Sequence, residues 1–149
     1  MQVPQLTTLN IPELKHAAAL LPATGKLAIS HNHLVYLDID DNYIYQLFPL
    51  LKTPHIEKPN YFSTYGVGAH ISVIYPEENK ILQQKYLGQE YHFTLQEMVI
   101  AEINLKKYYI LLVQSPALLH IRRKHELPDK LNFKNYEIGF HITIGVSGS

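Results

Sequence analysis

One pattern of residues occurs twice in this chain and restricts the folds that it can adopt. The stretches GVGAHISVIY (66–75) and GFHITIGV (139–146) both contain glycine, one residue, histidine, aliphatic, hydroxyl, aliphatic. Both have the apolar, β-branched character of a buried strand. Since side chains two residues apart on a strand point to the same face, each strand presents an imidazole and a hydroxyl on one face and aliphatic groups on the other. We therefore expect helices to cover the aliphatic faces and a polar site to form on the opposite side.

Each of these strands closes a longer unit of similar design. In the first unit, a predicted strand (33–40) and a predicted helix (42–51) precede a loop and the first histidine strand. In the second unit, a strand (107–115) and a helix (117–127) precede a loop and the second histidine strand. The repeat predicts an α+β fold of two pseudo-symmetric lobes, each an antiparallel sheet covered by helices, with a central cleft between them.

The length of the chain indicates a single domain, residues 1–149, with lobes of roughly 31–90 and 91–149. Residues 1–12 are expected to be an irregular arm, and 13–22 a short helix that ends at a proline. Further elements are expected as follows: a turn at 23–26, a loop at 52–66, a short helix or loop at 76–88, a strand at 91–104 and a loop at 128–137.

Composition excludes several classes of function. The 13 basic and 13 acidic residues balance, which argues against tight binding to long double-stranded nucleic acid, since that needs a basic face. There are no cysteines, so disulfides, thiolate catalysis and cysteine metal sites are impossible. The N-terminus lacks the form of a signal peptide, and no run reaches the roughly 18 apolar residues of a membrane helix. We therefore expect a cytoplasmic protein with no membrane partner.

The two histidine–hydroxyl pairs suit phosphodiester chemistry if they meet in one cavity. An imidazole, with a pKa of about 6.5, can take a proton from a nucleophile or give one to a leaving oxygen at neutral pH. His70 and His141 would fill these two roles, one starting neutral and the other charged. The hydroxyls of Ser72 and Thr143 can donate to the non-bridging oxygens of a phosphate. This scheme needs neither a metal nor a cofactor.

The paired motifs resemble those of the 2H phosphoesterase superfamily, in which AHISVIY and FHITIGV would be the two signatures. HLVYLDID and YYILLVQS are similar to its lobe-opening strands, and the likeness runs from about residue 31 onward. Within the superfamily, the pattern is most similar to the Swiss-army-knife RNA-repair-like bacterial proteins. The resemblance implies a phosphodiesterase for 2′,3′-cyclic or related RNA-end and nucleotide phosphodiesters, for which ligation in reverse is also chemically possible. It assigns His70 and His141 as the acid/base pair, and Ser72 and Thr143 as the phosphate-holding residues.

Other residues receive weaker assignments. A third histidine–hydroxyl triplet begins at His92, but no strand–helix unit precedes it, so His92 is expected to be a bystander. Tyr65 is our candidate for stacking on a substrate base. The carboxylates at 38–41 are expected to cap a helix, and the basic run IRRKHE (121–126) to be mainly a solvated helix face. The expected partner is a small nucleotide or an RNA end.

Two rival functions remain open at this point. The cleft could hold a nucleotide or RNA end without turning it over, as a sensor or accessory module. Alternatively, His31, His33 and His92 could hold a catalytic metal, since alternating imidazoles on a strand can bind zinc. Activity against cyclic nucleotides distinguishes the first rival, and sensitivity to a chelator distinguishes the second.

Overall fold

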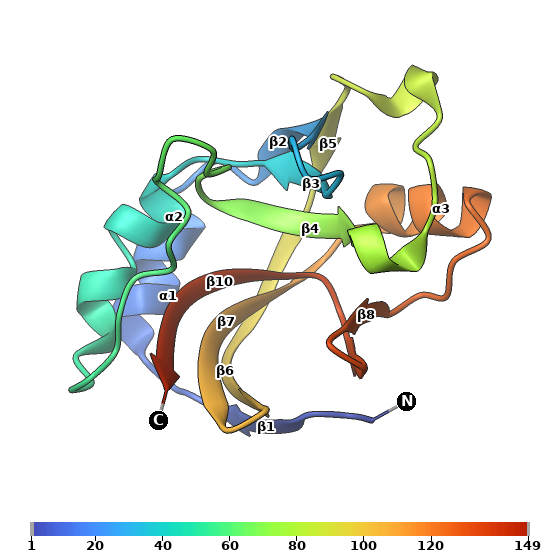
Figure 1. Ribbon diagram of the computed structural model, residues 1–149. Helices are drawn as coiled ribbons and strands as arrows, with labels where there is room; N and C mark the ends of the chain where they lie inside the picture. Colours follow the sequence, from blue (N-terminus) through green and yellow to red (C-terminus); the bar gives the residue numbers. More distant parts are fainter. Residues whose placement is uncertain (1, 149) are drawn as a thin grey trace.

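A computed structural model describes residues 2–148, and Met1 and Ser149, the ends of the predicted domain, lie outside it. Eight antiparallel strands form one sheet in the order β1-β6-β7-β10-β4-β3-β2-β5, and β8 and β9 form a separate hairpin (Figure 1). The strands are β1 (Gln5–Thr8), β2 (Thr24–Ile29), β3 (Val35–Asp38), β4 (His70–Ile74), β5 (Glu90–His92), β6 (Thr94–Ile103), β7 (Lys106–Gln114), β8 (Leu131–Phe133), β9 (Tyr136–Ile138) and β10 (His141–Gly148). The helices are α1 (Pro12–Ala19), α2 (Asn42–Tyr45) and α3 (Pro116–Lys124), with 3-10 helices η1 (Phe48–Leu51), η2 (Pro76–Glu78) and η3 (Gln84–Tyr86).

The α+β class is confirmed, but the strands of the two predicted lobes form a single sheet and not two separate sheets. The two histidine strands, β4 and β10, are neighbours at the middle of this sheet. They pair antiparallel at Ile71 and Ile142, with β3 on the outer side of β4 and β7 on the outer side of β10. The residue pattern of a strand reveals which faces it buries but not which strand lies beside it, so the joining of the two halves was not predicted.

The aliphatic residues of both motifs lie in the core, as expected. Ile71, Val73, Ile142 and Ile144 have no exposed surface. In Figure 1, α1 and α2 gather at one side of the sheet, and α3 lies toward the other end of the molecule. Within residues 2–148, no helix combines the length and the apolar composition that crossing a bilayer requires.

Several local predictions were wrong, in most cases because pairing with distant residues decides the structure. Residues 23–26 were predicted to be a turn, but β2 begins at Thr24 and pairs with β3 on one side and β5 on the other. The predicted N-terminal arm contains β1, which pairs with β6. The predicted loop 128–137 contains the β8–β9 hairpin. Its two turn residues, Lys134 and Asn135, both have positive φ, as a tight hairpin turn requires.

The helices follow their local signals more closely. The predicted helix 42–51 is divided into α2 and η1, with Pro49 in the second piece. Helix α3 begins at Pro116, and the hydroxyl of Ser115 caps it by accepting a hydrogen bond from the backbone N–H of Leu118. Asp40 accepts from the backbone N–H of Asn42 at the start of α2, which confirms one of the expected carboxylate caps.

Candidate active site

The pairing of β4 with β10 sets the arrangement of the four motif residues. Antiparallel partners step in opposite directions from the Ile71–Ile142 pair, so His141 lies across from Ser72, and Thr143 lies across from His70. All four side chains share the face opposite to the buried aliphatic residues. Each imidazole is therefore the cross-strand neighbour of the other motif's hydroxyl. The predicted meeting of the two motifs thus occurs across one sheet, and not between two facing sheets.

The repeated glycine explains how each imidazole is oriented. His70 contacts the carbonyl oxygen of Gly68 through Nδ1 at 2.9 Å, and His141 contacts that of Gly139 in the same way at 2.8 Å. A carbonyl only accepts, so both Nδ1 atoms carry the proton, and Nε2 is the ring nitrogen available to a substrate. The two histidines thus have the same tautomer and the same local support.

The first glycine also has a steric reason to be glycine. Gly68 has a φ of +69°, and a Cβ at this position would lie 2.4 Å from Oδ1 of Asp41. That same oxygen accepts a hydrogen bond from the backbone N–H of Ala69. Asp41, predicted to be one of the possible helix caps, therefore supports the residues that lead into His70.

The four motif side chains lie in one cavity of about 300 Å³. Its other lining residues are mainly aromatic and aliphatic. They come from the connection between β2 and β3, the loop before β4, the segment after β4, strands β6 and β7, and the β8–β9 hairpin. They are Asn32, Leu34, Tyr61, Tyr75, Pro76, Glu77, Ile103, Tyr108, Ile110, Phe133 and Ile138. Polar groups at the base of an apolar cavity are the usual composition of a small-molecule site.

Two tyrosines contact the motif hydroxyls, and the sequence analysis missed both. The hydroxyl of Tyr61 forms a hydrogen-bonding contact with Thr143, and that of Tyr75 does so with Ser72. Burial raises the pKa of both tyrosines, so each phenol stays protonated. The sequence indicates neither residue: Tyr75 follows Ser72 by three positions, which on a continuous strand would place it on the opposite face, and Tyr61 lies in a loop.

The environment of the histidines favours their neutral forms. Burial lowers the pKa of His70 below its usual 6.5, and the hydrogen bond to the Gly68 carbonyl offsets part of this effect. Burial also lowers the pKa of His141 to about 4; the hydrogen bond to Gly139 opposes that shift, and the nearby His70 adds to it. The ring of His70 lies edge-on to Tyr61, with centroids 4.6 Å apart. The cavity without a ligand therefore holds two neutral imidazoles at pH 7.

Other residues named in the sequence analysis lie elsewhere. Tyr65 is 72% exposed, its ring contacts that of His31 at 4.8 Å, and it is outside the cavity lining. His92 is exposed at the end of β5, where it pairs with Thr24. Within the described part of the chain, no three histidine, aspartate or glutamate side chains lie close enough to hold a metal ion, so His31, His33 and His92 do not form the metal site of the rival function.

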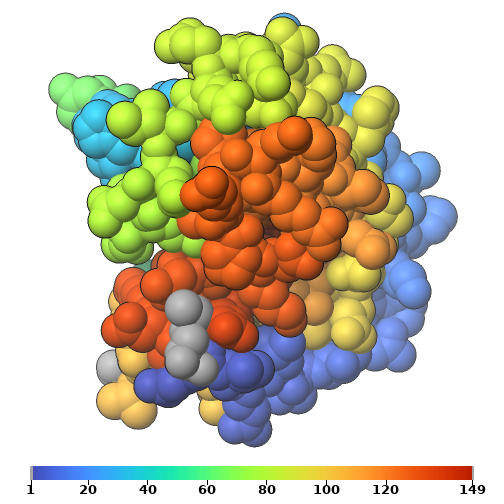
Figure 2. All heavy atoms as spheres, turned by 90° about the vertical axis from the view of Figure 1, so that its right-hand side faces the viewer, coloured from blue at the N-terminus to red at the C-terminus, as the bar shows by residue number. Residues whose placement is uncertain are grey.

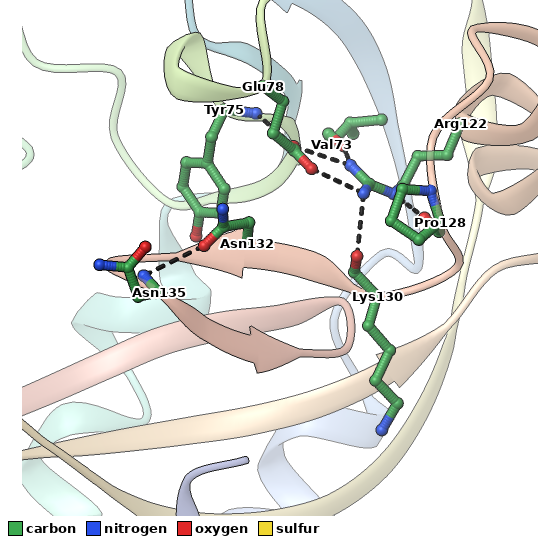
Figure 3. Close-up of polar contacts among 8 residues, drawn as sticks. All are labelled: Val73, Tyr75, Glu78, Arg122, Pro128, Lys130, Asn132 and Asn135. Carbon is green, nitrogen blue, oxygen red and sulfur yellow. Dashed lines mark hydrogen bonds and ion pairs between the residues drawn. The ribbon is translucent and has the colours of Figure 1, made fainter. Parts of the chain in front are cut away.

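Arg122 corrects the prediction for the basic run 121–126, because its side chain is fully buried and not solvated. Its guanidinium makes two hydrogen bonds to the Glu78 carboxylate, at 2.8 and 2.9 Å. It also donates to the carbonyls of Val73, Pro128 and Lys130 (Figure 3). All five N–H groups of the side chain are therefore bonded.

Arg122 joins the two halves of the molecule beside the cavity. Val73 lies next to Ser72 on β4, while Lys130 directly precedes the β8–β9 hairpin. In the space-filling view, α3 (orange) packs against the segment 76–88 (yellow-green) (Figure 2). His125 adds a second link there, since its Nε2 accepts from the backbone N–H of Gln83. The arginine thus positions the end of a histidine strand relative to one cavity wall.

Comparison with known proteins agrees with this geometry. The family model described as "Swiss Army Knife, 2H phosphoesterase domain" matches residues 35–149, which include both histidine strands and the strands beside them. Neither the curated proteins nor the solved structures yielded a match. The match confirms the resemblance inferred from the two motifs, including the subgroup. The chain belongs to the Swiss Army Knife group of 2H phosphoesterase domains.

Proposed function

We propose that this protein is a metal-independent phosphodiesterase that acts on 2′,3′-cyclic or related RNA-end and nucleotide phosphodiesters through His70 and His141. The observation that carries the proposal is the matched pair of imidazoles in one cavity, each bonded through Nδ1 to the carbonyl two residues before it. The family supports phosphoester chemistry in general, and this pair supports acid/base catalysis within it.

In the proposed reaction, one neutral imidazole removes a proton from water through Nε2 while the water oxygen attacks phosphorus. The other imidazole, protonated when substrate binds, gives its proton to the ribose oxygen that leaves. One P–O bond forms, one P–O bond breaks, and the product is a phosphomonoester with a free hydroxyl. The hydroxyls of Ser72 and Thr143 donate to the non-bridging oxygens, where charge increases in the transition state. Ligation uses the same groups with an RNA hydroxyl in place of water as the nucleophile: one P–O bond to that hydroxyl forms, one P–O bond of the cyclic phosphate breaks, and the product is a phosphodiester.

The pH dependence of kcat/KM follows from the pKa shifts of His70 and His141 in the free enzyme. Catalysis needs one neutral and one protonated imidazole, and both pKa values lie below the usual 6.5. We therefore expect kcat/KM to be highest below pH 6.5 and to fall about tenfold per pH unit on the alkaline side, where the acid loses its proton. The anionic substrate raises the pKa of both imidazoles, so the kcat optimum is expected at a higher pH than that of kcat/KM.

Initial rates from about pH 4.5 to 9, with circular dichroism at each pH to verify folding, measure this profile. A kcat/KM that is flat across this range, or that is highest well above neutrality, would contradict the acid/base pair. His92→Ala serves as the control and is expected to give the wild-type profile, because His92 lies outside the cavity.

The proposed function is tested with a panel of 2′,3′-cyclic nucleotides, 3′,5′-cyclic nucleotides and RNA ends, assayed with EDTA present. We expect hydrolysis of at least the 2′,3′-cyclic substrates at a rate that EDTA does not change, because the proposed groups are all side chains of the protein. Tight binding without turnover would instead favour the non-catalytic binding module. Loss of activity with EDTA, recovered on adding a metal, would favour a metal hydrolase.

A further inference from the structure

The cavity contains almost no charged side chains, although its proposed ligand is an anion. No lysine or arginine lines it, and its one carboxylate is Glu77. Both arginines of the sequence have partners within the protein. Arg122 uses all five of its donors there, and Arg123 forms an ion pair with Asp129 at 2.7 Å. The ammonium of Lys134 lies over the ring of Phe133 at 5.3 Å from its centroid, outside the lining.

The groups that can contact a phosphate are therefore neutral. They are the hydroxyls of Ser72 and Thr143, supported by two tyrosines, and two imidazoles that burial keeps uncharged. Neutral donors can stabilise one delocalised negative charge by hydrogen bonds. The one imidazole that is protonated when an anion binds offsets a single charge, and a second charge in the same apolar surroundings would find no lysine or arginine in the lining and would lie near Glu77.

The cavity walls suit a single aromatic group. Phe133 lies between two tyrosines, with ring centroids 5.5 Å from Tyr75 and 5.7 Å from Tyr108. Ile103, Ile110 and Ile138 complete the apolar lining. Aromatic side chains stack on nucleic-acid bases of any type. At about 300 Å³, the cavity is at the small end of ligand sites, which fits one nucleoside and not a chain of them.

We infer that this cavity selects a cyclic mononucleotide: a phosphodiester with one negative charge and one base, in preference to a phosphomonoester or the end of a polynucleotide. The inference rests on the proposed function for the identity of the site. Polynucleotide binding draws much of its affinity from lysine and arginine contacts to successive phosphates, which this lining does not offer. Hydrolysis adds a second negative charge to the ligand, so the product is expected to leave more readily than the substrate.

Calorimetry with three ligands that share one base tests this inference. They are 2′,3′-cyclic AMP, adenosine 3′-monophosphate and an RNA trinucleotide that ends in adenosine 2′,3′-cyclic phosphate. The protein is the His141→Asn variant, which keeps a polar side chain but should not consume the ligands. We expect the cyclic mononucleotide to bind at least about tenfold more tightly than the monophosphate, and the trinucleotide to gain no more than about twofold. The affinity of the trinucleotide should change less than about twofold between roughly 50 and 200 mM salt.

Glu77→Gln removes the one carboxylate of the lining. It is expected to strengthen binding of the monophosphate by about threefold or more while leaving the cyclic mononucleotide within about twofold. Glu90→Gln is the matched control, since Glu90 is an exposed carboxylate on β5 outside the cavity. Equal responses to the two substitutions would contradict the role of cavity charge.

The outcomes separate this inference from the proposed function. If wild-type protein cleaves no phosphodiester, the proposed catalysis fails, while the order of the three affinities still tests the selectivity. If cleavage occurs but the trinucleotide binds tenfold more tightly with a steep salt dependence, or the monophosphate binds as well as the cyclic ligand, the inference fails alone. Absence of binding by all three ligands to both wild type and variant would overturn it as well.

Discussion

His70→Ala and His141→Ala are each expected to lower kcat for hydrolysis of a 2′,3′-cyclic nucleotide by about 10² to 10⁴-fold, which is the usual contribution of a general acid or base. Both imidazoles share the same tautomer and the same cavity, so removal of either leaves one of the two proton transfers without a partner. Because the two act as a unit, the double variant is expected to be little slower than either single variant.

The measurement is single-turnover kinetics at saturating substrate, with thermal unfolding to verify that each variant is folded. His92→Ala is the matched control: it also begins a histidine–hydroxyl triplet, but on an exposed strand outside the cavity, and it is expected to retain wild-type kcat. Similar activity in all three variants would reject the site assignment. A tenfold loss in His92→Ala would show that the sequence repeat selected the wrong histidines.

Arg122→Ala is expected to be the most destabilising single substitution near the site, with a loss of about 3–5 kcal/mol in the free energy of unfolding. Removal of the guanidinium leaves the buried Glu78 carboxylate without its ion-pair partner and three carbonyls without their donor. The loss should also reduce activity, because Val73 is adjacent to Ser72 and the freed Lys130 carbonyl precedes the hairpin that carries Phe133.

Denaturant unfolding of Arg122→Ala and Arg123→Ala provides the comparison. Arg123 is the adjacent arginine on the same helix, and its ion pair with Asp129 is exposed, so its substitution should change stability little. If Arg122→Ala does not fold, Glu78→Gln tests the same pair, since it removes the charge while retaining the side-chain size. Equal stability of the Arg122 and Arg123 variants, or no loss in Glu78→Gln, would contradict the role of the buried network.

The sequence predicted which face of each motif strand carries the histidine and the hydroxyl, because strand period alone determines it. In GVGAHISVIY and GFHITIGV, alternation assigns the histidine and hydroxyl to one face and the aliphatic residues to the other, and the structure has this arrangement. The helix predicted at 117–127 also rested on a local pattern, and α3 forms over Pro116–Lys124. Alternation does not reveal which strand lies beside which. Two sheets were therefore predicted, whereas the pairing of β4 with β10 joins both halves of the molecule into one sheet.

Most parts of the site that were missed depend on contacts between distant residues. Arg122 lies in a run of basic residues that is typical of a solvated helix, and only Glu78, far away in the sequence, makes its burial possible. Tyr61 is one aromatic residue in a loop, and its contact with Thr143 follows from the path of that loop. Tyr65, the aromatic residue chosen from the same loop, contacts His31 instead. The β8–β9 hairpin was missed because its turn, Lys134–Asn135, lacks the glycine that usually marks such turns.

The division of the cavity between sheet and loops affects how its specificity can be altered. The proposed acid/base pair belongs to the two central strands, whose spacing is fixed by main-chain pairing at Ile71 and Ile142. Part of the apolar wall that would touch a base, including Phe133, comes from the β8–β9 hairpin, which makes no part of that pairing. A protein engineer could therefore exchange Phe133, or lengthen the hairpin turn, to admit a different ligand while the reacting groups keep their geometry.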